Sequence, residues 1–116
     1  MSHSEFRVFK GPLQDFDKLK GQIESFVTTN KVSARSIGIE FIERTKEVLM
    51  SLGYAADAYT PVTLNIVNLG MLDLNDTEGI ARKMSEAARQ QRNVICHEHC
   101  VTDTNEFHMV FMSQAE

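Results

Sequence analysis

The sequence predicts an α+β domain in which a β-α-β-β unit occurs twice. Two stretches carry apolar residues at helical spacing, and six short stretches alternate or are rich in β-branched residues, as strands are. We therefore expect two units, at about residues 6–53 and 62–113, within a single domain covering residues 1–116. Together they should form one six-stranded, mainly antiparallel sheet with both helices packed on one face.

The first unit begins with a short strand, because apolar and polar side chains alternate in Phe6–Phe9. The apolar side chains of residues 16–29 fall on one helical stripe, which predicts a helix. Between residues 36 and 52 the period changes to two around a polar turn, which predicts a β-hairpin. The segment from Tyr54 to Pro61 is then expected to be a connecting loop.

The second unit repeats this order. Residues 62–71 are apolar enough to form a central strand, and Asn75 with Glu78 is a plausible capping pair for a helix that continues to about residue 90. A second hairpin is predicted over residues 94–113.

A constant shift along the chain aligns the two units and pairs identical residues, namely Gly11 with Gly70, Leu13 with Leu72, Asp17 with Asp76, Thr45 with Thr104, Glu47 with Glu106, and Met50 with Met109. The order of elements resembles the duplicated β-α-β-β modules of the GyrI-like effector-binding fold. This resemblance is one of topology, so it transfers no residue roles.

Composition excludes several classes of protein. The formal net charge of -4 argues against a general nucleic-acid binder, which needs a concentrated basic surface. The most apolar stretch, residues 62–72, is interrupted by Asn65 and Asn68, so no membrane span is expected. The first residues lack the pattern of a signal peptide, and the two cysteines are expected to be free thiols in a cytoplasmic protein.

The most concentrated set of reactive side chains lies in residues 94–101, which contain both cysteines and two of the four histidines. In a strand, alternate side chains share a face, so Cys96, Glu98 and Cys100 point one way and His97 and His99 the other. The cysteines are then too far apart for a disulfide or a shared metal ion. They are expected to be small core residues.

The histidines suggest a transition-metal site. A turn centred on Thr104 and Asn105 would place His99 opposite Val110, and His108 would then share a face with His97 and His99. The alternative is three polar residues on a partly wet sheet face. A one-residue shift of the hairpin register would move His108 to the other face.

Glu98 suggests a different kind of site, since an unpaired carboxylate does not suit an apolar layer. It could line an opening for a small-molecule ligand, together with Tyr54 and Tyr59 of the connecting loop. Such a site would belong to a small-molecule sensor or a weakly specified enzyme. The alternative is that Glu98 lies near the sheet edge and reaches solvent. No residues with a recognisable catalytic arrangement are found in the sequence.

The sheet face away from the helices is predicted to be unusually apolar, with Ile42, Leu49, Ile95, Val101, Val110 and Met112. Such a face could pack on a second copy through a two-fold axis or accept a small hydrophobic ligand. The first hypothesis is therefore a homodimeric α+β binding or scaffold module. A metal-binding or metal-responsive protein that uses the three histidines is the second, and the ligand-binding reading of Glu98 is the third.

Overall fold

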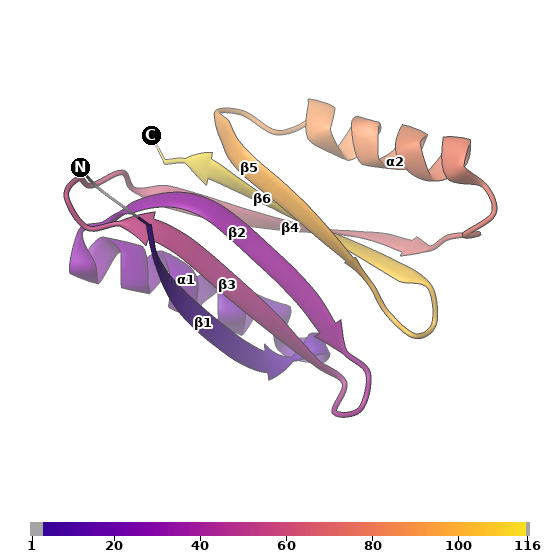
Figure 1. Ribbon diagram of the computed structural model, residues 1–116. Helices are drawn as coiled ribbons and strands as arrows, with labels where there is room; N and C mark the ends of the chain where they lie inside the picture. The colour runs from indigo at the N-terminus through magenta and orange to yellow at the C-terminus, as the bar shows by residue number, and fades with distance from the viewer. Residues whose placement is uncertain (1–3, 116) are drawn as a thin grey trace.

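The computed structural model describes residues 4–115, and in this part of the chain the β-α-β-β order occurs twice (Figure 1). The first unit consists of β1 (Glu5–Pro12), a 3-10 turn (Leu13–Asp15), α1 (Phe16–Asn30), β2 (Ser33–Ile42) and β3 (Glu47–Ala55). The second consists of β4 (Val62–Met71), α2 (Thr77–Arg89), β5 (Val94–Val101) and β6 (Glu106–Gln114). The predicted order of elements is confirmed.

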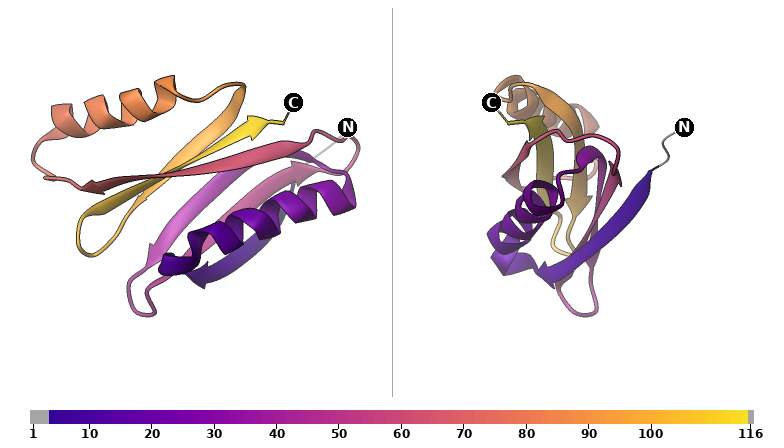
Figure 2. Two further views of the ribbon diagram at one scale, coloured as in Figure 1. Left: turned by 180° about the vertical axis from the view of Figure 1, so that it is seen from behind. Right: turned by 90° about the vertical axis from the view of Figure 1, so that its left-hand side faces the viewer.

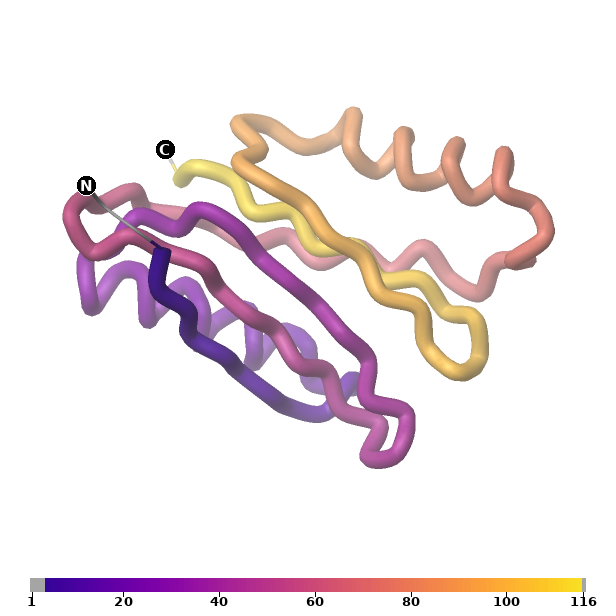
Figure 3. The backbone as a smooth tube through the Cα atoms, viewed as in Figure 1, coloured from indigo at the N-terminus to yellow at the C-terminus, as the bar shows by residue number. Residues whose placement is uncertain are grey.

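The strands form two separate antiparallel sheets, β1-β3-β2 and β4-β6-β5, so the prediction of a single six-stranded sheet is wrong. The edge strands β2 and β5 run alongside each other in the same direction (Figures 1 and 3). Each has an irregular register near its start, between Ala34 and Ser36 in β2 and between Val94 and Cys96 in β5. Such bulges bend a strand and disrupt its pairing locally, and the two sheets remain separate at this junction.

The main core lies between the two sheets, where α1 contacts both β1 and β4. The helical stripe of α1 buries Phe16, Leu19, Ile23 and Val27. These side chains pack against apolar residues of both sheets, including Val48, Met50, Leu52, Leu64, Val110 and Met112. Burial of this continuous apolar layer is the main term that holds the two units together.

The two helices lie on opposite faces of the second sheet, not on one face as predicted (Figure 2). Side chains alternate along β6, so Val110 and Met112 join the core under α1. Met109 and Phe111 face the other way and pack with Ala87 of α2. Each helix covers the face of its own unit. Because β2 and β5 meet in the same direction, the second unit is turned over relative to the first.

The tips of the two hairpins are joined by an ion pair between Lys46 and Asp103. The Lys46 ammonium, hydrogen-bonded to the carboxylate, lowers the pKa of Asp103. Both side chains are exposed enough that we assign this pair a role in positioning the tips rather than in stability.

The two units are covered unequally. α2 has Ala87 as its buried residue, with Met84 partly buried. The face of the first sheet turned away from α1 has no helix or strand of residues 4–115 packed on it (Figures 1 and 2). Phe6 and Val8 on this face are 68% and 54% exposed. Within the described residues, no helix is long and apolar enough to cross a membrane.

Candidate functional site

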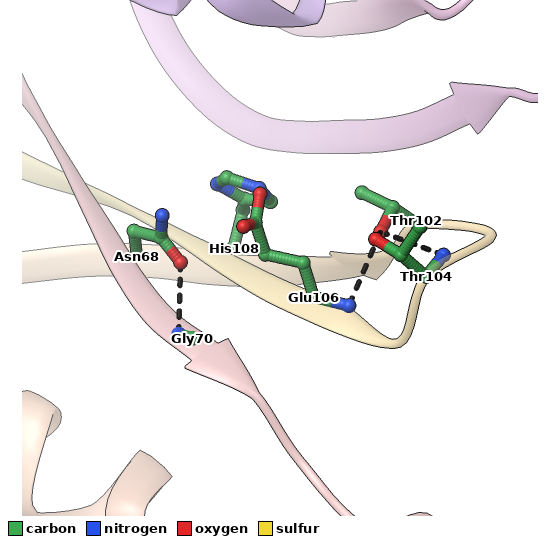
Figure 4. A network of polar contacts seen from close by, with 6 residues as sticks. All are labelled: Asn68, Gly70, Thr102, Thr104, Glu106 and His108. Atoms are coloured by element: carbon green, nitrogen blue, oxygen red, sulfur yellow. Dashed lines mark hydrogen bonds and ion pairs between the residues drawn. The ribbon is translucent and has the colours of Figure 1, made fainter.

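The register of the second hairpin decides how its histidines are placed. The chain turns tightly over Asp103–Asn105, with Asn105 in the left-handed region at φ 65°, so His99 pairs with Met109 and Cys100 with His108. The hydroxyl Oγ1 of Thr102 accepts hydrogen bonds from the backbone amides of Thr104 and Glu106, at 3.3 and 3.1 Å (Figure 4). The predicted register, with His99 opposite Val110, is wrong by one residue.

As a result, His108 does not share a face with His97 and His99. It is 6% exposed and packs against Phe16, with ring centroids 5.5 Å apart. Its Nε2 atom lies 2.7 Å from Oε1 of Glu106 (Figure 4). This contact satisfies a ring nitrogen that would otherwise be costly to bury.

His97 and His99 lie on the α2 side of β5, and both are exposed. The ring of His97 lies 6.1 Å from that of Phe111, and the ring of His99 stacks on Phe107 at 6.3 Å. Within residues 4–115 no group of three or more histidine, cysteine or acidic side chains is arranged to hold a metal ion. The His97, His99 and His108 face predicted as a metal site is therefore not formed.

The two cysteines are core residues, as the sequence predicts. Cys100 is buried, and burial raises the pKa of its thiol to about 11. Cys96 packs against the main core at the junction of β5 with β2. Burial raises the pKa of Cys96, and the Glu98 carboxylate adds to this, while a hydrogen bond from the backbone of Ile37 opposes it. Neither thiol is activated for nucleophilic chemistry, which requires a lowered pKa.

The residues predicted to line a ligand site have different neighbours. Glu98 is exposed on β5, although its cross-strand partner Val110 is buried. Tyr54, at the end of β3, packs edge-to-face on Phe26 with centroids 5.3 Å apart. Tyr59 lies in the loop before β4, where the Lys31 ammonium is 5.6 Å from its ring centroid. A joint site for these three residues stays a prediction.

The residues of the predicted apolar face do not form one surface, because they lie in different parts of the structure. Val110 and Met112 are buried in the main core, because the register shift turns them inward. Val101 lies on the α2 side of β5. Ile42 and Leu49 lie on the first sheet, on the side opposite the core residues Met50 and Leu52.

We call this uncovered side of the first sheet the outer face. Three rows of side chains cross it from β1 over β3 to β2, namely Phe6, Gly53 and Ser36; Val8, Ser51 and Gly38; and Lys10, Leu49 and Glu40. In the first two rows a large side chain on β1 is matched by a small one on β2. In the third a cation on β1 is matched by an anion on β2.

Sequence reasoning missed Phe6 and Val8 as surface residues. The signal was present, since they alternate with Arg7 and Phe9. The face they occupy could be assigned only once α1 was known to pack on Phe9.

Comparisons with models of known protein families, with curated proteins and with solved protein structures gave no match. The candidate surface therefore has to be interpreted from its own geometry.

Proposed function

We propose that the protein is a binding and scaffold module that works as a homodimer, with the outer face as its interface. The observation that carries this proposal is the self-complementary arrangement of the three rows that cross the face. Consider a two-fold axis that runs along β3, midway between two facing copies. It places β1 of each copy over β2 of the other and brings each row onto itself.

The shapes of the side chains match in that arrangement. Phe6 of one copy lies over Ser36 of the other, and Val8 lies over Gly38. The second row is low, because only the Ser51 hydroxyl lies beside Gly38, whereas in the first row both the Ser36 hydroxyl and the Phe6 ring lie against Gly53. The small side chains of the second row allow the sheets to approach closely there, and the two Phe6 rings then bury exposed area.

The charges match in the third row, and in the next row the axis sets Glu47 of each copy against Glu47 of the other, each beside a Lys10. The two-fold axis sets Lys10 of each copy against Glu40 of the other, and Leu49 against Leu49. Glu47 lies on β3 close to the axis, where the Nζ atom of Lys10 of its own chain is 3.7 Å from Oε1. Opposite charges in register favour the correct pairing and disfavour a shifted one.

The size of the face sets the expected strength. Three strands about 4.8 Å apart and about eight residues long make a footprint of roughly 14 by 26 Å. This is smaller than the ~800 Å² per partner of a standard stable interface. We therefore expect a dimer with a dissociation constant in the micromolar range, which dilution separates into monomers.

The test is a charge exchange followed by sedimentation velocity over a concentration series. The variant Glu40→Lys sets two lysines against each other and should weaken the dimer at least tenfold. The double variant Lys10→Glu with Glu40→Lys restores opposite charges and should restore most of the affinity. Glu43→Lys makes the same charge change in the exposed hairpin tip and should leave association unchanged.

Two results would overturn the proposal. One is a strict monomer for the unaltered protein at millimolar concentration. The other is a dimer that responds equally to Glu40→Lys and Glu43→Lys, because its interface would then lie elsewhere. Thermal melting of each variant shows whether the monomer itself stays folded.

A further inference from the structure

A second surface lies on the other side of β1, where this strand and α1 form the walls of an open groove of about 760 Å³. The β1 wall consists of Arg7, Val8 and Phe9, and the α1 wall includes Lys18, Gln22 and Ser25. β1 is an edge strand, and within residues 4–115 no strand pairs with its groove side. The groove therefore combines unpaired backbone groups with a neighbouring helix.

The aromatic part of the groove positions one of its cations. Phe9 and Phe26 pack edge-to-face with centroids 6.0 Å apart. The guanidinium of Arg7 lies over both rings, at 5.9 and 5.3 Å from their centroids. Such stacking restrains an arginine side chain without using its hydrogen-bond donors. Arg7 can thus donate to a ligand in the groove.

The contacts that α1 makes with its two neighbouring edge strands, β4 and β1, are different. On the β4 side, Oε2 of Glu24 accepts a hydrogen bond of 2.7 Å from the backbone amide of Leu64, so a side chain already occupies that edge. On the β1 side α1 presents Lys18 and leaves the groove open. An unprotected edge beside a helix is the geometry in which proteins take up an extended peptide as an additional strand.

The second unit has the corresponding groove between β4 and α2, but it is smaller, about 280 Å³. The α2 wall of this second groove includes Ala87, whereas the α1 wall of the first groove includes the larger Phe26. The β4 wall is bulged between Asn68 and Gly70, and the Gly70 amide is hydrogen-bonded to Oδ1 of Asn68 at 2.8 Å. A bulged edge whose amide is already bonded is protected against strand addition. The comparison singles out the first groove as the one left open.

We propose that the groove between β1 and α1 binds an extended acidic peptide, which adds to β1 as a further antiparallel or parallel strand. The residues that line the groove include two cations, Arg7 and Lys18, and none of them is acidic. A peptide residue that points toward α1 meets these cations, whereas its neighbours lie beside Val8 on the outer side. The matching sequence alternates acidic and apolar residues.

A second copy of β1 is a poorer occupant. This strand carries Arg7 and Lys10 against the single acid Glu5. Two such strands together carry four cations against two acids, an excess of positive charge that disfavours their pairing at the groove. The groove and the outer face share Val8 but otherwise use different residues, so the peptide and the dimer are tested separately.

The test uses an acetylated, amidated eight-residue peptide that alternates valine with aspartate or glutamate, and a control peptide with lysine in place of each acid. The full-length ¹⁵N-labelled protein is titrated with each peptide and followed by NMR. We expect the acidic peptide to shift the amide signals of residues 5–11 and of Ser25 and Thr29. It should bind at least tenfold more tightly than the lysine peptide.

Two variants test the role of charge. Lys18→Glu should weaken binding of the acidic peptide severalfold, and Arg7→Glu combined with it should reverse the preference between the peptides. Lys83→Glu changes the same charge in the second groove and should have no effect. The titration is repeated with Glu40→Lys, in which the groove is intact whether or not the protein dimerises.

The proposal fails if both peptides bind equally, or if neither shifts the signals of β1 at millimolar concentration. It also fails if the shifts centre on β4 and α2. Because the Lys18 side chain is exposed, its variant remains informative even if the Arg7 substitution disturbs the packing of Phe26.

Discussion

Cys100 and His108 are direct cross-strand neighbours on β5 and β6, and both are buried. A thiol, an imidazole and the Glu106 carboxylate thus lie in one part of the second sheet, as in some nucleophilic sites. Nucleophilic attack requires the thiolate, but burial raises the pKa of Cys100 to about 11 and favours the neutral thiol. We interpret these three residues as structural, with the Glu106 carboxylate hydrogen-bonded to the buried ring of His108.

The raised pKa of Cys100 predicts a loss of stability at high pH. The folded state favours the neutral thiol, so the contribution is complete below 9.0, the ordinary pKa, and is lost as the pH rises toward about 11. Between these values the free energy of unfolding should fall by up to about 1.4 kcal/mol per pH unit from this group. Urea unfolding of the protein and of Cys100→Ala at several pH values checks this. An identical pH dependence in both proteins would contradict it.

The hydrogen bond from Leu64 to Glu24 predicts a stability effect across the helix–sheet contact. Glu24→Ala leaves the amide of Leu64 without its acceptor and should lower the free energy of unfolding by about 1–3 kcal/mol. Glu24→Gln keeps a neutral acceptor and should cost less. Urea denaturation measures both changes. If the two variants were as stable as the unaltered protein, the bond would contribute nothing.

Gly21 predicts a stabilising substitution. It lies inside α1, is exposed, and a Cβ atom added there meets nothing within 4 Å. Gly21→Ala should therefore raise the free energy of unfolding by about 0.5–1 kcal/mol, since glycine is the poorer helix former. Thermal melting and urea denaturation report the change. A destabilised variant would show that the helix needs glycine at this position.

The N-terminus of α2 predicts a local effect. The Asp76 side chain accepts a hydrogen bond of 3.0 Å from the Gly79 amide, and α2 itself is thinly covered. Asp76→Ala should cost about 1 kcal/mol in helix stability. Amide hydrogen exchange should then be faster in α2 while α1 keeps its protection. Equal acceleration in both helices would contradict a local role for this cap.

Much of the fold could be predicted from the sequence, because it depends on local periodicity. The stripe of α1 and the alternation in β2 and β3 are visible in the residues themselves. The equivalence of Met50 and Met109 also holds, since each faces the helix of its own unit.

What could not be predicted depends on contacts between segments that are distant in the sequence. The break between the sheets lies where β2 and β5 meet, which is a contact between segments that are distant in the sequence. The face of His108 depends on one hydroxyl, Thr102 Oγ1, which selects the tighter turn. A one-residue difference there was enough to move both Val110 and His108 from the face of His97 and His99 to the core face, which removes the third ligand of the predicted metal site.

The central claim is that the outer faces of two copies meet around an axis along β3. The most direct measurement is an isotope-filtered NOE experiment on a mixture of labelled and unlabelled protein, at a concentration where sedimentation shows dimer. We expect intermolecular NOEs from the ring of Phe6 to Ser36 and from the methyl groups of Val8 to Gly38. Intermolecular NOEs confined to α2 and the histidine side of β5, with none on the outer face, would contradict the claim.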